Sequence, residues 1–280
     1  MDGILLINKE KNLTSRDVVN NLMKILNTKK IGHAGTLDPL ATGLLVIGVG
    51  KGTKILDLLT LDTKEYIAVV KMGIQTDTMD ITGKVLKVTD NIKLSKEELE
   101  TVLKSYQKSY EQIVPKYSAV KINGKKLYEY ARNNIEIELP KRLVNIFNIE
   151  LLDYNEDNNE FTFKTLVSKG TYIRSLIDDI GNSLNIDCTM KELVRVKSGK
   201  FNLQESFNIL DDFKFIKIED AIDFPKIIIK NDFLLKKVKN GNLINLDNNE
   251  EYVTLLDETN QILAIYKKIE NNLYKAFKVF

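Results

Sequence analysis

The sequence of 280 residues contains one cysteine, one histidine, no tryptophan and only four prolines. A single cysteine, Cys188, cannot form an internal disulfide, and such low usage is typical of a reducing compartment. Zinc sites take three or four ligands, mostly Cys and His. With His33 as the one histidine, the sequence excludes zinc bound by cysteine and histidine. A Cys–His protease would require Cys188 to meet His33, and nothing local supports that.

Long apolar runs are also absent. No run approaches about 18 residues, the length that a membrane-spanning helix needs. Residues 1–9 have no basic leader and an apolar run of only four residues, which is typical of a strand rather than a secretion signal. We therefore expect a cytoplasmic protein. Hydrophobic residues make up 43% and charged residues 29%, which excludes collagen-like, mucin-like and fully disordered chains.

Charge of either sign is not in large excess. The chain has 41 Lys and Arg against 39 Asp and Glu, a net charge of +2 that does not by itself indicate a nucleic-acid binder. Two segments are locally basic. Residues 24–54 hold five basic residues and one acid, Asp38, and residues 104–142 hold nine basic and four acidic residues. Such segments are most often solvated faces, but both flank loops here, which favours anion binding.

The pattern of apolar residues predicts strands and helices in mixed order. Strands are expected at 4–7, 44–49, 65–72, 84–88, 117–122, 135–139, 144–152, 160–167 and 193–197. Helices are expected at 14–27, 54–61, 95–106, 127–132, 172–180 and 219–222, and a glycine-rich loop at 32–43. Strands and helices do not alternate regularly, which favours an α+β fold over a doubly wound one.

The pattern changes after Pro225, where short strands at 253–256, 262–266 and 274–280 follow one another. We therefore predict two domains, residues 1–228 and 229–280. The second is about fifty residues long, which is small for an independent core, so we expect it to pack on the first.

The glycine-rich run 43–53 fails as a phosphate-binding loop. A P-loop needs Gly-Lys-Ser/Thr after the required spacing, whereas Val49 follows Gly48. A dinucleotide fingerprint would need a third glycine at position 53, which is Thr53. The sequence therefore disfavours a nucleotide-hydrolysing, phosphate-ester or dinucleotide enzyme.

The neighbouring loop, Gly32–Gly43, carries the one acid of its basic segment, Asp38. An Asp before Pro is most often a turn former, and this is one interpretation of Asp38. A carboxylate surrounded by cations also suits a nucleophile or a base. The residues alone leave both interpretations open.

This loop, GHAGTLDPLATG, resembles the signature of the bacterial tRNA pseudouridine-55 synthases, the TruB family. Further stretches match that family in order: Lys64–Tyr66, Gln75–Asp80, Tyr117–Lys121, Gly124–Arg132 and Ser168–Arg174. The resemblance covers most of residues 3–200, and the chain after residue 230 resembles the family's PUA-like domain more weakly. The sequence departs from the family at Asn8-Lys9-Glu10, usually Asp-Lys-Pro, and at Pro115, usually one of a proline pair.

The resemblance implies the pseudouridine synthase fold, a mixed, mainly antiparallel sheet flanked by helices, with a small β-rich PUA-like domain at the C-terminus. It implies an isomerase that replaces the N1–C1′ bond of uridine 55 in the tRNA T-loop by a C5–C1′ bond, without metal or cofactor. Asp38 would be the nucleophile, attacking C1′ or first abstracting a C2′ proton. Arg174 would hold Asp38 in a two-pronged contact, and Tyr66 would stack on the uracil.

The same resemblance implies an RNA-binding set. Tyr172 and Leu193 would wall the base pocket, and His33 would fill the space that the flipped base leaves. Basic residues would contact T-arm phosphates; they are Lys9, Lys125, Lys126 and Arg132. The structural alternatives are core packing for the apolar residues and a solvated surface for the charged ones. The partner would be the tRNA T-arm, with no protein partner implied, and the chain a monomer.

Two other functions stay open on the sequence. One is a tRNA-binding protein or chaperone that uses the same cleft without catalysis. The other is a pseudouridine synthase that acts on rRNA or on another tRNA position. Formation of pseudouridine separates the first from an enzyme, and a comparison of RNA substrates separates the second.

Overall fold

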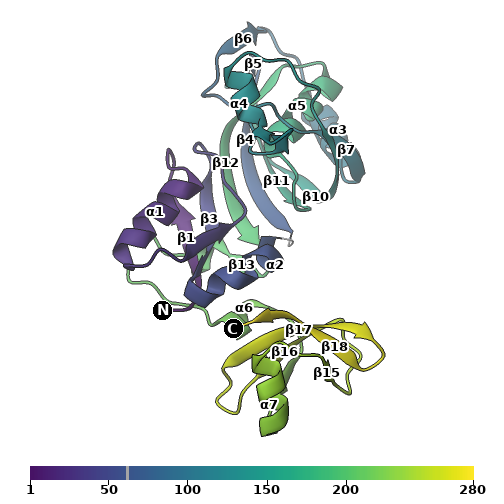
Figure 1. The fold of residues 1–280 in the computed structure, drawn as a ribbon. Coiled ribbons are helices and arrows are strands. Elements are labelled where there is room, and N and C mark those ends of the chain that lie inside the picture. The colour runs from purple at the N-terminus through teal and green to yellow at the C-terminus, as the bar shows by residue number, and fades with distance from the viewer. Residues whose placement is uncertain (61–62) are drawn as a thin grey trace.

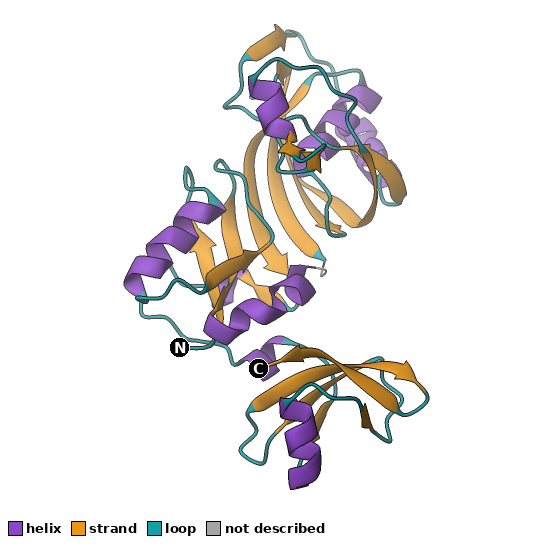
Figure 2. Cartoon of the chain, in the orientation of Figure 1, coloured by secondary structure: helices purple, strands orange, loops and turns teal. Residues whose placement is uncertain are grey.

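The computed structural model describes residues 1–60 and 63–280, and the fold is α+β, as the sequence predicted. Figures 1 and 2 show a long curved sheet with helices packed on it and a smaller sheet beside the two chain ends. The large sheet has the order β1-β3-β12-β4-β11-β10-β7, with β2 added to β3 and β13 added to β12. All its pairings are antiparallel except β3 with β12.

The strands of the large sheet are β1 (Gly3–Lys9), β2 (Ile31–Ala34), β3 (Thr42–Val49), β4 (Lys64–Met72), β7 (Ser109–Ile113), β10 (Lys141–Asn155), β11 (Glu160–Val167), β12 (Cys188–Ser198) and β13 (Phe201–Asn202). The helical segments are α1 (Ser15–Ile25), η1 (Gly50–Ile55), α2 (Leu56–Thr60), α3 (Lys96–Ser105), α4 (Leu127–Arg132), α5 (Ile173–Leu184), η2 (Leu203–Glu205), α6 (Ile218–Ala221) and α7 (Asp232–Lys239). Two small hairpins are β5 (Ile74–Thr76) with β6 (Val85–Val88) and β8 (Lys121–Ile122) with β9 (Lys125–Lys126).

Local sequence explains where the helices begin. Thr14 caps α1 through the backbone N–H of Asp17, and the Asp17 carboxylate accepts from the backbone of Thr14 in return. Ser95 and Glu98 form the same capping box ahead of α3. Both helix starts were predicted from these residue pairs. None of the helices in the described residues is long and apolar enough to cross a membrane.

The main core lies between the sheet and the helices α3 and α5. Alternate residues of β4 are buried there, among them Tyr66, Ala68 and Val70, because successive side chains of a strand point to opposite faces. Leu37 and Leu40 enter the same core from the loop that follows β2. A second core packs α1 against β1 and β3. The loop that carries Asp38 is thus anchored in the main core on both sides.

The two halves of the large sheet meet at a narrow seam. Strand β12 pairs with β3 in parallel over only two positions, Val194 with Thr42 and Arg195 with Gly43. Gly43 has φ +100°, and a Cβ there would clash with the carbonyl oxygen of Arg195. Any residue with a side chain would push the strands apart at this point. Figure 1 shows β1 and β3 on one side of the seam and β12, β4, β11 and β10 on the other.

The smaller sheet has the order β14-β16-β17-β18-β15, and α7 packs on it. Its strands are β14 (Lys226–Ile228), β15 (Ile244–Asn245), β16 (Tyr252–Leu256), β17 (Ile262–Glu270) and β18 (Leu273–Val279). Ile265 of β17 belongs to the same buried cluster as Ile4 and Leu44 of the large sheet. Lys278 also lies 2.7 Å from Asp57 of α2. The domain division after residue 228 stays a prediction. Strand β14, which comes before this division in the chain, already belongs to the smaller sheet.

Several sequence-based assignments were wrong in detail. The start of the expected loop 32–43 is strand β2, which pairs with β3. Residues 135–139 form no strand, although their alternating pattern predicted one; they border a cavity of about 870 Å³ beside α4 and Tyr117. In the range 117–122 only Lys121–Ile122 is a strand. The expected helix 54–61 is η1 followed by α2, and its last residue, Leu61, lies outside the described residues.

Candidate active site

Asp38 sits at the tip of a loop that is fixed on both sides. The Leu37 N–H donates to Oγ of Ser15 at 2.8 Å, and this buried hydroxyl donates back to the Leu37 carbonyl at 3.2 Å. On the other side the Pro39 carbonyl accepts from the Asn12 N–H at 2.8 Å. The Asp38 side chain itself is 37% exposed. The loop therefore presents a carboxylate to solvent from a rigid support.

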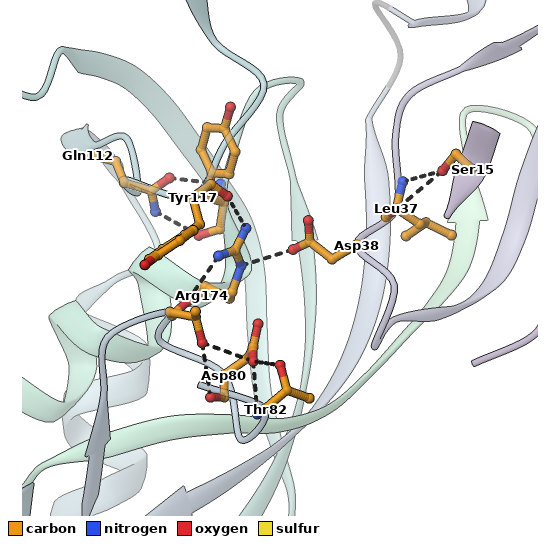
Figure 3. A network of polar contacts seen from close by, with 10 residues as sticks. Ser15, Leu37, Asp38, Asp80, Thr82, Gln112, Tyr117 and Arg174 are labelled. Carbon is orange, nitrogen blue, oxygen red and sulfur yellow. Dashed lines mark hydrogen bonds and ion pairs between the residues drawn. The ribbon is translucent and has the colours of Figure 1, made fainter. Parts of the chain in front are cut away.

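Arg174 meets this carboxylate from the first turn of α5. Its Nε lies 2.9 Å from Oδ2 of Asp38, and its side chain is only 5% exposed (Figure 3). Its two Nη groups donate to the carbonyls of Thr78 and Tyr117, both at 3.0 Å. The expected two-pronged contact is thus wrong. The contact between the two side chains runs from Nε, and each Nη donates to a main-chain carbonyl instead.

The loop between β5 and β6 holds one of these carbonyls in place. Asp80 accepts hydrogen bonds from the Thr78 hydroxyl, the Thr82 N–H and the Thr82 hydroxyl through Oδ1, as Figure 3 shows. Asp80 is 7% exposed, and its backbone forms an isolated β-bridge with Met190 of β12. The carbonyl of Thr78 is thereby oriented toward Arg174. The carbonyls of Thr78 and Tyr117 could not be predicted from residue types, because every residue has such an oxygen.

Three of the expected pocket residues lie around this pair. Tyr66 and Leu193 are 8% and 7% exposed and belong to the core that contains Leu37 and Leu40. Tyr172 precedes α5, and its backbone N–H and C=O are both hydrogen-bonded by the side chain of Gln112. Tyr66 and Leu193 therefore share one core with Leu37 and Ile173, the chain neighbours of Asp38 and Arg174, and apolar side chains of this kind suit a flat, uncharged ring.

His33 lies on β2, opposite Ile47 of β3. Its side chain is half-buried, and its Nδ1 is buried without a hydrogen-bond partner among the described residues. Burial, and then the nearby charge of Arg195, lower its pKa below 6.5. The ring is therefore uncharged at pH 7. An uncharged ring suits stacking better than acid catalysis.

Lys9 was expected to contact RNA, and the structure corrects this. The residue is fully buried, and its ammonium donates to the carbonyls of Leu13 at 2.6 Å, Glu10 at 2.9 Å and Pro39 at 3.4 Å. Burial lowers its pKa to about 8, although the charge of Asp38 opposes the shift. Lys9 therefore stabilises the Asp38 loop through the Pro39 carbonyl instead of facing a ligand.

A second buried cation, Arg195, was missed on the sequence. It is 1% exposed, its Nε donates to the Leu44 carbonyl at 2.7 Å, and its Nη2 donates to the Gly35 carbonyl at 3.2 Å. These bonds tie β12 to β3 and to the start of the Asp38 loop. A single arginine in a strand carries no local sign of such a role.

The other expected RNA-binding cations lie on the β8–β9 hairpin and α4. Lys125 and Arg132 are exposed and Lys126 is half-buried. The ammonium of Lys126 and the guanidinium of Arg132 both lie 5.3 Å from the centre of the Tyr128 ring. Lys125, Lys126, Tyr128 and Arg132 together form a basic and aromatic surface, and they follow Tyr117 closely in the chain. The described residues contain no group of three or more His, Cys, Asp or Glu placed to hold a metal ion.

Comparison with known proteins identifies the family. Residues 23–173 match the model of the TruB family pseudouridylate synthase N-terminal domain. The chain is 41% identical to a tRNA pseudouridine synthase B of Bacillus cytotoxicus, covering 95% of this chain and 92% of the relative. It is 42% identical to one of Fusobacterium nucleatum over the whole of both chains.

Solved structures support the fold. A chain in the crystal structure of a Cbf5-Nop10-Gar1 complex superposes with a TM-score of 0.72 at 24% identity, covering 96% of this chain and 79% of that one. This likeness concerns the fold alone. Taken with the identities over nearly full length, it leads to one conclusion: the chain belongs to the TruB family of pseudouridylate synthases.

Proposed function

We propose that this chain isomerises uridine 55 in the T-loop of tRNA to pseudouridine. One observation carries the proposal: a part-exposed carboxylate, Asp38, faces the buried guanidinium of Arg174, and the chain neighbours of both lie in the core that contains Tyr66 and Leu193. The relatives are named tRNA pseudouridine synthase B, which agrees with this substrate. Base, sugar and phosphate are all retained in the product, so the reaction consumes no second substrate and needs no redox partner.

Asp38 is assigned as the group that breaks the glycosidic bond. Its ionised carboxylate either attacks C1′ of the ribose or removes the C2′ proton, and in both cases the N1–C1′ electron pair leaves with the uracil. The uracil then turns, and its C5 forms the new bond to C1′. In the first route the bond between the carboxylate and C1′ breaks as C5 bonds to C1′, and in the second the proton held by Asp38 returns to C2′. The C5 proton is then lost and N1 gains a proton, which balances the isomerisation. Arg174 holds the carboxylate in place and stabilises its charge.

The uracil has to leave the stack of the T-loop to reach Asp38. Flipping a base costs a few kcal/mol. We assign Tyr66, Tyr172 and Leu193 to the pocket that receives the flipped base, and the uncharged ring of His33 to the space that it leaves. Stacking on an aromatic ring contributes about 1–3 kcal/mol per base, so these contacts can offset the cost.

The basic surface of Lys125, Lys126 and Arg132 is assigned to T-arm phosphates. Phosphate contacts position RNA without reading its sequence, and recognition would then follow the shape of the folded loop. The segment 230–280 has eight basic and seven acidic residues. We therefore assign it a minor share of RNA affinity as a PUA-like domain, with a monomeric chain and a cytoplasmic location as further parts of the proposal.

A T-arm hairpin labelled with tritium at uracil C5 tests the proposal. The purified chain, with EDTA present, is expected to release tritium to water, and replacement of uridine 55 is expected to stop the release. Binding without release would favour the non-catalytic RNA-binding alternative. Release from rRNA fragments or other tRNA positions, but not from this hairpin, would identify a synthase for another site.

A further inference from the structure

Gln112 is a buried polar residue for which the sequence suggested no role. It lies on β7, the edge strand of the large sheet, and is 1% exposed. Its Oε1 accepts from the Tyr172 N–H at 2.8 Å, and its Nε2 donates to the Tyr172 carbonyl at 3.2 Å (Figure 3). The same Nε2 donates to the Tyr110 hydroxyl at 2.8 Å. One side-chain amide thus holds both backbone polar groups of the residue that precedes α5.

This clamp lies two residues from Arg174. The side chain of Tyr172 makes no capping bond at the start of α5, and Gln112 holds the backbone of this N-cap residue from β7. A second bond supports it, because Oγ of Ser175 donates to the Ile113 carbonyl of β7 at 2.9 Å. Residues of β7 are therefore hydrogen-bonded to the start of α5 on both sides of Arg174.

The same strand also leads to a partner of that guanidinium. The chain passes from Ile113 to Tyr117, whose carbonyl accepts from Nη2 of Arg174. A movement of β7 relative to α5 would shift Arg174 and one of its anchors in different directions. Through its hydrogen bonds to Tyr172, Gln112 fixes the position of β7 relative to the start of α5.

The orientation of the Gln112 amide is itself fixed. The Tyr110 hydroxyl donates to Oδ2 of Asp179 at 3.0 Å, so toward Gln112 it can only accept. Burial and the charge of Asp179 raise the pKa of Tyr110, which keeps this hydroxyl protonated. Nε2 must therefore point to Tyr110, and Oε1 is left for the Tyr172 N–H. The three side chains form one directed chain of hydrogen bonds.

We propose that Gln112 is a positioning residue for the isomerisation, which sets the guanidinium of Arg174 against Asp38 through the backbone of Tyr172. The inference rests on the proposed function. It concerns no contact between Gln112 and the substrate, since Gln112 is buried behind α5. Its effect should therefore reach the reaction only through Arg174.

Gln112→Met tests this, because methionine keeps the size and removes all three hydrogen bonds. Small misplacements of a reacting group cost up to about 100-fold in rate. We expect kcat for tritium release to fall about 10- to 100-fold, with KM for the hairpin within about threefold. Gln107→Met is the matched control, since Gln107 also donates to a backbone carbonyl, that of Phe147, but from an exposed turn. It should leave both constants unchanged.

A double-mutant cycle separates positioning from loss of structure. If Gln112 acts through Arg174, Gln112→Met should lower kcat less than about threefold in an Arg174→Lys background. An equal loss in both backgrounds, or an unchanged kcat in the wild-type background, would overturn the proposal. If Gln112→Met does not fold, Tyr110→Phe replaces it in the same cycle, with an expected loss of about three- to tenfold that vanishes beside Arg174→Lys.

A spectroscopic readout does not depend on turnover. The chain has five arginines, so the Nε–H signal of Arg174 can be assigned by its loss in Arg174→Lys. Gln112→Met is expected to shift and broaden this signal, while Gln107→Met is expected to leave it in place. An unchanged signal would contradict the inference even if the wild-type chain converts no uridine, and failure of the wild-type enzyme alone would overturn the proposed reaction.

Discussion

Nε of Arg174 lies 2.9 Å from Oδ2 of Asp38, and both Nη groups of the same guanidinium are held by main-chain carbonyls. The arginine is therefore fixed by partners that cannot titrate, and one edge of it is left for the carboxylate. The carboxylate is the more exposed partner, at 37% against 5%. This asymmetry leaves Asp38 accessible to a ligand while its partner stays in place.

Asp38→Asn should abolish turnover and leave RNA binding intact. The amide keeps the shape of the side chain but is a poor nucleophile and base, so we expect kcat to fall by at least about 10⁴-fold. The hairpin Kd should stay within about threefold. Tritium release and a binding titration measure the two effects. Asp153→Asn, at an exposed acid of β10, is the control, and comparable turnover by Asp38→Asn would remove the assignment as nucleophile.

Arg174→Lys should lower kcat by about 100-fold, since an ammonium cannot reach Asp38 and two separate carbonyls with the fixed geometry of a guanidinium. The buried carbonyls of Thr78 and Tyr117 would lose their donors, so the midpoint of thermal unfolding should also fall. Single-turnover rates and a melting curve check this. Wild-type rates in the variant would show that the pair is structural only.

Lys125→Ala combined with Lys126→Ala should weaken RNA binding and flatten its salt dependence. Each lost phosphate contact lowers the slope of log K against log salt by about 0.7–0.9, so the double variant should lose about 1.5. Fluorescence titrations of the hairpin at several salt concentrations measure it. Lys93→Ala with Lys96→Ala, at exposed positions next to the start of α3, is the control. A slope equal to that of the wild type would take both lysines out of the RNA contact.

Lys9 should make stability rise in alkaline solution. Its pKa is about 8 in the folded chain and 10.5 when unfolded, so between these values the unfolded chain binds more protons. The free energy of unfolding should then gain up to about 1.4 kcal/mol per pH unit from this residue, and nothing below pH 8. Urea unfolding at pH 7 to 10 should show the gain in the wild type and in Lys11→Met, an exposed control. Lys9→Met should lack it, and equal slopes in all three would contradict the lowered pKa.

His33 should tolerate replacement by another ring. Because its pKa is below 6.5, it is uncharged at pH 7 and its proposed role is stacking. His33→Phe should keep kcat/KM within about threefold, and its pH profile between 6 and 8 should match that of the wild type. His33→Ala should lose about 5- to 150-fold, the equivalent of 1–3 kcal/mol of stacking. A large loss in His33→Phe would point to proton transfer instead.

The parts of the fold that the sequence predicted are those with a local cause. The capping boxes at Thr14 and Ser95 and the alternation of β4 need only nearby residues. Strand β7 was missed because it is an edge strand with one buried side chain, that of Gln112. The alternation of residues 135–139 predicted a strand, but no neighbouring strand pairs with it in the described chain.

In the candidate site, too, the residues with a local signal could be predicted and the others could not. Asp38 stood out as a lone acid among cations, and the family resemblance named Arg174, Tyr66 and His33. The positions of Lys9 and Arg195 could not be predicted, because each is a cation whose partners are backbone carbonyls, some of them from distant segments, such as Pro39 for Lys9 and Leu44 for Arg195. Carbonyl acceptors are the same for every sequence, so such a site leaves no mark in the residue types.

The narrow seam between β3 and β12 makes the geometry of the site depend on how these two strands are joined. Asp38 lies on the loop between β2 and β3, Arg174 lies on α5 beyond β12, and in the described chain two residue pairs join β3 to β12 through their backbones. Side chains supply further bonds across the join, notably the guanidinium of Arg195. The twist between β3 and β12 thus contributes to the distance between the two charges. A substitution that alters this twist can slow the reaction from a distance, without touching any residue of the pocket.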